Sequence, residues 1–145
     1  MALTRANVEA IQVKRTGPLL TVAGMAVTVA GANADLNDPI GRAVRDLGYT
    51  VTDIATVADA DVAQVTVARY DEFLLVAELH TWETILGNLD DVDIVVGPRS
   101  EKLSQTAELI ERKLVRLYGQ LQLMYNYGLA TPTAGYITLT IAEHE

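Results

Sequence analysis

The chain has no cysteine, and other residue types on which enzymes depend are scarce. The absence of cysteine excludes disulfide bonds and thiolate chemistry, and it leaves the redox compartment undetermined. Only two serines, Ser100 and Ser104, and two histidines, His80 and His144, occur among the 145 residues. Neither serine lies in a G-x-S-x-G turn, and no second histidine or cysteine stands at metal-ligand spacing. The sequence therefore predicts a protein that is not an enzyme and has no metal or cofactor, with His80 on the surface or at a subunit contact.

Positive charge is also scarce. The chain carries 11 Lys and Arg residues against 19 Asp and Glu residues, a net charge of −8. This balance argues against a surface whose main role is to bind nucleic acid. From Asp46 to Asp93, eleven carboxylates are accompanied by the single cation Arg69. Two interpretations remain open for this region: a solvated acidic face, or a surface that repels a passing polyanion.

A long apolar run suited to a membrane is lacking as well. Thr16–Ala34 is uncharged, follows Lys14 and Arg15, and ends in Ala-Asn-Ala, so it imitates a secretory signal. However, residues 1–15 contain Glu9 and have the pattern of an amphipathic helix, unlike a short basic leader. Three glycines and a proline also make the segment a poor membrane span. We therefore expect a soluble, unprocessed chain that folds as one domain around a core of its own.

Helical periodicity dominates what is present. A continuous helix is predicted over Asp59–Asn88, and a second over Lys102–Tyr127. About a dozen residues connect the two, so an antiparallel pair of long helices is the simplest arrangement. Their facing stripes are Val65, Ala68, Leu75, Leu79, Trp82, Leu86 and Leu89 on the first, and Leu103, Ala107, Ile110, Leu114, Leu117, Leu121 and Met124 on the second.

Shorter helices are predicted before this pair. Thr4 is expected to cap the first of them. Asp38 is expected to cap the third, and Gly48 to end it in a left-handed conformation. The predicted ranges are Thr4–Arg15, Pro18–Met25 and Pro39–Leu47.

Two short β-strands are predicted, at Val92–Val96 and in a C-terminal tail. Because a sheet of two strands is marginal, the tail has the alternative of adding to another subunit. The predicted fold class is therefore mainly α, with a helical domain over residues 1–135 and a strand tail over residues 136–145. The tail alternates Ile137, Leu139 and Ile141 with Tyr136, Thr138 and Thr140.

Four large apolar residues of the second long helix fall outside its stripe. Two helices alone leave such residues exposed, so we expect them to pack on the N-terminal helices or on a neighbouring subunit. They are Leu109, Val115, Tyr118 and Leu123.

The order of these elements, with the phrases D-P-I-G-R-A-V-R-D-L-G-Y and V-D-I-V-V-G-P-R-S-E, resembles the head–tail connector (adaptor) proteins of long-tailed bacteriophages. The resemblance covers most of the chain and is carried by Asn37–Gly41 and Val96–Arg99. It implies a structural virion protein, made in the host cytoplasm, that forms a ring beneath the portal. Such rings are typically dodecameric, extend the DNA channel without binding DNA specifically, and dock the next neck or tail protein.

The resemblance also implies sites. The C-terminal tail would engage the portal through Tyr136, Ile137, Thr138, Leu139, Thr140 and Ile141. Carboxylates of the acidic region would face the channel, with Asp71, Glu72, Glu78 and Glu83 as candidates, and Arg69 would contact a neighbour. The alternative function is a small dimeric helical module with a regulatory or protein-binding role.

Overall fold

The protein is mainly helical. The computed structural model describes residues 2–25, 33–53, 55–92 and 98–128, and within these ranges it contains no strand. The predicted mainly α class is thus confirmed, whereas the predicted tail over residues 136–145 lies outside the described residues. So does the predicted strand, except for Val92, which ends a helix. The elements are α1 (Arg5–Thr16), α2 (Leu19–Val22), the 3₁₀ helix η1 (Ala34–Leu36), α3 (Asn37–Asp46), α4 (Asp59–Val62), the 3₁₀ helix η2 (Val67–Arg69), α5 (Tyr70–Val92) and α6 (Pro98–Tyr125).

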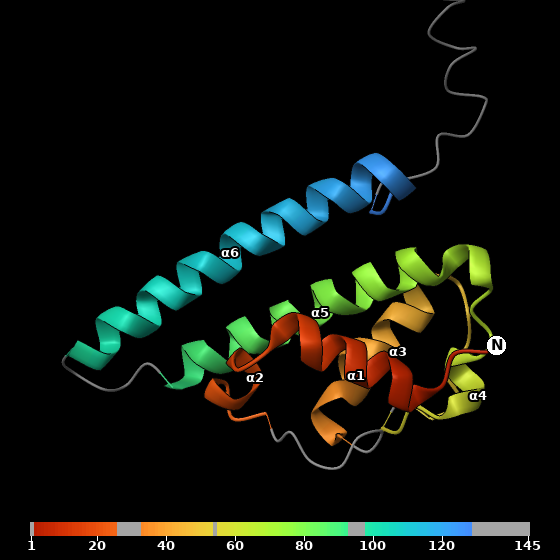
Figure 1. Ribbon diagram of the computed structural model, residues 1–145, viewed down its shortest axis with the longest axis horizontal. Coiled ribbons are helices and arrows are strands. Elements are labelled where there is room, and N and C mark those ends of the chain that lie inside the picture. Colours follow the sequence, from red (N-terminus) through yellow and green to blue (C-terminus); the bar gives the residue numbers. More distant parts are fainter. Residues whose placement is uncertain (1, 26–32, 54, 93–97, 129–145) are drawn as a thin grey trace, which may run out of the picture.

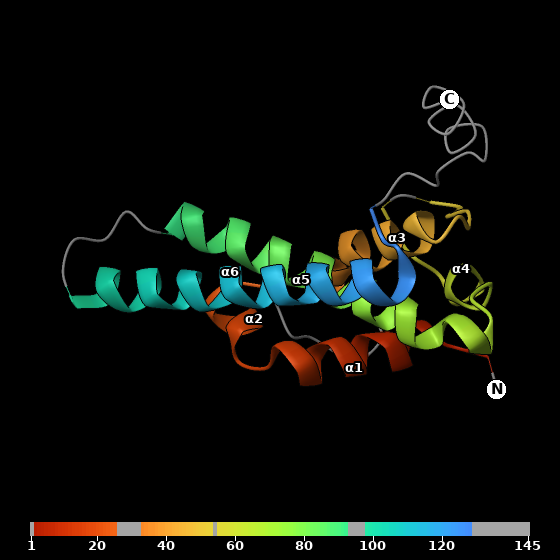
Figure 2. The same cartoon turned by 90° about the horizontal axis from the view of Figure 1, so that it is seen from above.

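Helix α5 is the centre of the fold. It contacts α1, α2, α3 and α6 (Figure 1). Seen from above, α1 and α3 lie on opposite flanks of α5, and α6 lies across it (Figure 2). The side chains of α5 are accordingly buried around most of its circumference: Phe73, Leu74, Val76, Ala77, Leu79, Trp82, Ile85 and Leu89. The predicted stripe covered only one of these faces, because it anticipated one partner helix and the structure supplies several.

The two ends of α1 follow from local sequence signals. The Thr4 hydroxyl oxygen accepts a hydrogen bond from the Asn7 amide at 3.2 Å, as an N-cap does. Gly17 ends the helix with φ +56°, a conformation that glycine adopts without steric cost. On the buried face, the Gln12 side chain donates to the carbonyl oxygen of Leu74 on α5, at 3.2 Å. The predicted first helix is confirmed.

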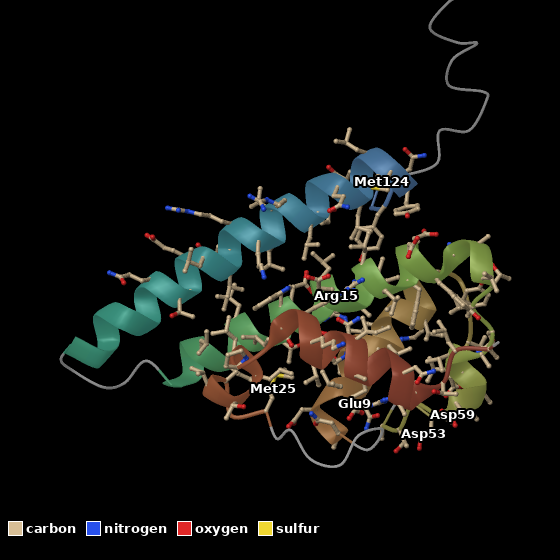
Figure 3. All side chains as sticks on the ribbon, viewed as in Figure 1. Glu9, Arg15, Met25, Asp53, Asp59 and Met124 are labelled. Carbon is tan, nitrogen blue, oxygen red and sulfur yellow. The ribbon has the colours of Figure 1, made fainter. Side chains whose placement is uncertain are left out.

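A buried polar network holds the start of α1. The Arg5 guanidinium donates to the carbonyl oxygen of Asn33 at 2.8 Å and lies 3.6 Å from the Glu9 carboxylate. The Arg5 amide donates to the carboxylate of Asp59, at the start of α4, at 2.7 Å. Figure 3 labels Glu9 and Asp59 on these two helices. The network therefore joins α1 to α4 and to the segment before α3.

Helix α3 begins two residues earlier than predicted and ends at Asp46, one residue before the predicted end. It starts at Asn37, directly after η1, so Asp38 lies inside the helix and is not its cap. Gly48 has φ +89°, and its amide donates to the Arg45 carbonyl at 2.9 Å, which satisfies one of the last carbonyls of the helix.

The prediction of one continuous helix over Asp59–Asn88 is wrong. Helix α4 ends at Val62, and α5 begins only at Tyr70, so the chain is not α-helical between them. Residues 65–67 are Val-Thr-Val, and a run of β-branched residues disfavours a helix. The Gln64 side chain also donates to the Thr50 carbonyl at 2.7 Å, which favours the turn. At the other end, α5 continues through Gly87 to Val92, because burial of flanking side chains outweighs a helical glycine's cost of about 1 kcal/mol.

The Asp61 carboxylate fastens the loop before α4 to the helix. It accepts hydrogen bonds from the Ala58 amide at 2.9 Å and from the Thr52 amide and hydroxyl at 3.2 Å. Burial of this carboxyl opposes its ionisation, but the hydrogen bonds from Ala58 and Thr52 outweigh that effect and hold the pKa of Asp61 below its ordinary 3.8.

We expect Asp61→Asn to lower the free energy of unfolding at pH 7 by about 1 kcal/mol. Because the pKa is lowered on folding, the contribution is fully present above pH 3.8 and is lost as the pH falls through the folded value. The deficit of the variant should therefore shrink in acid, as measured by urea unfolding at pH 7 and pH 3. Glu111→Gln, at an exposed position of α6, is the matched control. A pH-independent deficit would contradict the assignment.

Candidate functional site

The four acidic residues proposed for a channel lie on α5, and three of them form ion pairs. Asp71 is exposed in the first turn of the helix. The others are paired as follows: Glu72 with Arg69 at 3.0 Å, Glu78 with Arg15 at 3.1 Å, and Glu83 with Arg42 at 3.6 Å.

These carboxylates point to different sides of α5. The partner of Glu78 lies on α1 and the partner of Glu83 lies on α3, and these helices occupy opposite flanks of α5 (Figure 2). The structure therefore does not bring the four residues together on one face of a single chain, and cations of the same chain offset much of their charge.

Arg69, proposed for a contact with a neighbour, is engaged within its own chain. Besides Glu72, it donates to the Leu47 carbonyl at 2.9 Å, and its guanidinium lies 5.7 Å from the centre of the Tyr49 ring. The hydrogen bond to Glu72 holds the pKa of Arg69 above its ordinary value. Arg69 thus fastens the start of α5 to the end of α3.

His80 is buried, with a relative exposure of 4%, so its predicted surface position is wrong. Its Nε2 lies 2.6 Å from an oxygen of Asp46 on α3, and its Nδ1 lies 3.0 Å from an oxygen of Glu83. A ring that meets a carboxylate at both nitrogens can donate in both directions only when both nitrogens carry a proton. Local sequence revealed only Glu83, because Asp46 is 34 positions away and comes from another helix.

Tyr127, two residues after the end of α6, contacts both Asp46 and His80. Its hydroxyl donates to the same oxygen of Asp46 at 2.7 Å. Burial, reinforced by the Asp46 carboxylate, raises the pKa of Tyr127, so the hydroxyl remains a donor. Asn126 and Gly128 have φ of +55° and +74°, which turns the chain back after α6. The group of Asp46, His80 and Tyr127 fixes the end of α6 to α3, and both nitrogens of the buried His80 ring are occupied, so neither is left for a substrate.

Helix α6 buries one stripe against α5 and leaves large apolar side chains exposed. The buried stripe is formed by Ile110, Leu117 and Leu121. The prediction that four apolar residues fall outside it is confirmed, and Met124, near the end of the helix in Figure 3, joins them although it was expected in the stripe. The exposures are 62% for Leu109, 75% for Val115, 41% for Tyr118, 89% for Leu123 and 58% for Met124.

Grooves border the buried stripe of α6. One contains three cations on α6 beside apolar residues of three helices: Leu19, Trp82, Leu109, Ile110, Arg112, Lys113 and Arg116. Another lies against a different part of α5: Leu79, Glu83, Leu114, Val115, Tyr118, Gly119 and Gln122. A third hollow beside it is formed by Glu108, Glu111, Arg112 and Val115.

Three further findings concern metal ions, membranes and similar proteins. Among the side chains that the structure describes, no group of three or more His, Asp or Glu residues is arranged to hold a metal ion. None of the described helices is long and apolar enough to cross a membrane. Comparison of the chain with protein-family models, with curated proteins and with solved structures gives no match.

Proposed function

We propose that the chain is a structural protein of the bacteriophage neck: a head–tail connector that assembles into a ring beneath the portal. In this role it extends the DNA channel and docks the next neck or tail protein. The proposal places it in the virion after synthesis in the host cytoplasm, with no catalytic role and no cofactor. It combines the resemblance of the sequence with the surface of α6.

The exposed apolar surface of α6 is the observation that carries the proposal. Five large apolar side chains of one helix are at least 41% exposed, although half of the whole chain is apolar and a core is formed elsewhere. Exposed apolar side chains gathered on one element mark an interaction surface. A closed ring needs such surfaces, because each subunit contacts two neighbours through different faces.

Within the ring, α5 and α6 would act as an antiparallel pair that forms the wall. The strand tail over residues 136–145 would reach the portal, with Tyr136–Ile141 as its contact residues. Among the four acidic candidates, Asp71 and Glu83 are the more exposed, so they are the first choices for the channel surface. Repulsion by these carboxylates would let DNA pass without adhering.

Native mass spectrometry and negative-stain imaging of the purified chain, alone and with a bacteriophage portal protein, test this proposal. A ring with an axial hole, alone or on the portal, is expected. A chain shortened after residue 135 should keep its helical circular dichroism and lose attachment to the portal. A stable dimer that does not bind the portal protein would instead support the alternative function, a dimeric regulatory or protein-binding module. Attachment of the shortened chain would overturn the assignment of the tail.

A further inference from the structure

The two flanks of α6 carry opposite charge. On one flank, Leu109, Lys113 and Arg116 recur at i, i+4 and i+7, so they share one side of the helix. Together with Arg112 they border the groove whose apolar part includes Trp82. The Lys113 ammonium lies 4.4 Å from the centre of the Trp82 ring. We name Leu109, Arg112, Lys113 and Arg116 the basic flank.

The other flank repeats the spacing with acidic and apolar residues. Glu111, Val115 and Tyr118 also recur at i, i+4 and i+7. The buried residues Ile110 and Leu117 lie between the two flanks on the helical circumference. With Glu108, which borders the same hollow as Glu111 and Val115, they form the acidic flank. Arg112 also borders this hollow and lies 3.9 Å from the Glu108 carboxylate, so the two flanks meet on the exposed side of the helix. Val115 is 75% exposed and stands between these carboxylates and Tyr118.

We infer that the basic flank of one copy binds the acidic flank of a second copy, so that α6 joins neighbouring subunits head to tail. Val115 of one copy would enter the groove beside Trp82 of the next. Glu108 and Glu111 would then face Arg112 and Arg116, and the exposed ion pair between Arg112 and Glu108 of one chain would be exchanged for ion pairs between copies. The inference rests on the proposed ring and names the contact that closes it.

Charge complementarity identifies the second copy as the occupant. Pairing either flank with itself around a two-fold axis would place like charges opposite each other, which is unfavourable. An acidic peptide or a nucleic acid could satisfy only the basic flank and would leave Val115 and Tyr118 exposed. A head-to-tail contact covers the basic flank of one copy and the acidic flank of the next, and the pair retains one free flank of each kind for further copies. Ion pairs at an exposed rim add little affinity but fix partner and orientation, while the apolar contacts add affinity.

Charge-reversed variants test the inference. R112E/R116E alters the basic flank, E108K/E111K alters the acidic flank, and circular dichroism checks that both keep their helical content. Each variant alone should assemble at least about tenfold more weakly than the parent chain. Mixed in equal amounts, the two should assemble with alternating subunits, because every contact then pairs opposite charges: the unaltered flanks at one interface and the two reversed flanks at the next. All four substitutions in one chain should restore assembly. K14E/R45E, at exposed positions of α1 and α3, is the control with the same change in charge as R112E/R116E.

The outcomes separate this inference from the proposed function. If the parent chain forms rings and neither flank variant weakens them, the contact is wrong and the connector role stands. If the parent chain forms no ring, alone or on the portal, both fail. If R112E/R116E abolishes binding of a labelled oligonucleotide or an acidic peptide but leaves assembly unchanged, the basic flank serves that ligand and the inference is overturned.

Discussion

Replacing Trp82 with alanine is expected to lower the free energy of unfolding by about 3–5 kcal/mol. Trp82 is 2% exposed and lies on α5, the helix that contacts most others, so its removal opens a cavity at the centre of the fold. The loss combines the transfer free energy of the indole with the cost of a space that neighbouring side chains cannot fill. Trp82 is the only tryptophan of the chain, so the variant lacks the usual fluorescent probe of unfolding. Urea unfolding is therefore followed by circular dichroism.

Two comparisons make the Trp82 measurement specific. Trp82→Phe should cost less than Trp82→Ala, because the smaller ring retains part of the packing. Leu123→Ala should change the free energy of unfolding by less than about 0.5 kcal/mol, because Leu123 is 89% exposed. A loss below about 1 kcal/mol for Trp82→Ala would mean that α5 is not the centre of the core.

Replacing Arg5 with leucine is expected to cost about 3–5 kcal/mol, since it leaves the buried carboxylate of Glu9 without its cation. The two side chains are only 6% and 3% exposed. Burial lowers the pKa of Arg5 against the opposing effect of Glu9, which reflects the cost of removing this cation from water. The substitution also deprives the Asn33 carbonyl and the Asn37 side chain of a donor.

The double variant Arg5→Leu/Glu9→Leu separates the pair from its surroundings. Removing both charges should cost less than removing Arg5 alone, because no buried charge is then left without its partner. Lys14→Ala, at an exposed position of α1, controls for the loss of a positive charge. If the double variant is less stable than Arg5→Leu, the loss comes from packing and not from the uncompensated carboxylate. Urea unfolding at pH 7 provides all three values.

Sequence alone predicted the features that depend on neighbouring residues. The Thr4 cap, the interruption at Gly17-Pro18 and the left-handed Gly48 are all found where expected, since each requires only nearby backbone groups. The turn after α4 escaped prediction because it depends on partners farther along the chain, such as the hydrogen bond from Gln64 to Thr50. The helical spacing of apolar residues does not show that hydrogen bonds to distant residues favour a turn over a helix at these positions.

The surroundings of His80 could not be predicted for the same reason. Asp46 and Tyr127 are 34 and 47 positions away, and neither stands in a motif that announces a partner. Four of the five exposed apolar residues of α6 were predicted, in contrast, because helical spacing alone places them away from the stripe, whereas Met124 was expected in it. The opposite charges of the two flanks could not be assigned to an interaction surface from the sequence, because the structure is needed to show that α5 covers the stripe between them.

Helix α6 is held on one side only. Helices α1 and α3 both pack on α5. Helix α6 packs on α5 through one buried stripe, and the hydrogen bond from Tyr127 to Asp46 joins its end to α3. Elements with few buried contacts open at a lower free energy than the global unfolding free energy. We therefore expect α6, which packs on α5 alone, to open at a lower free energy than the helices on the other sides of α5. Binding of another molecule to the exposed face of α6 would raise the free energy of opening of this helix towards the unfolding free energy of the whole domain.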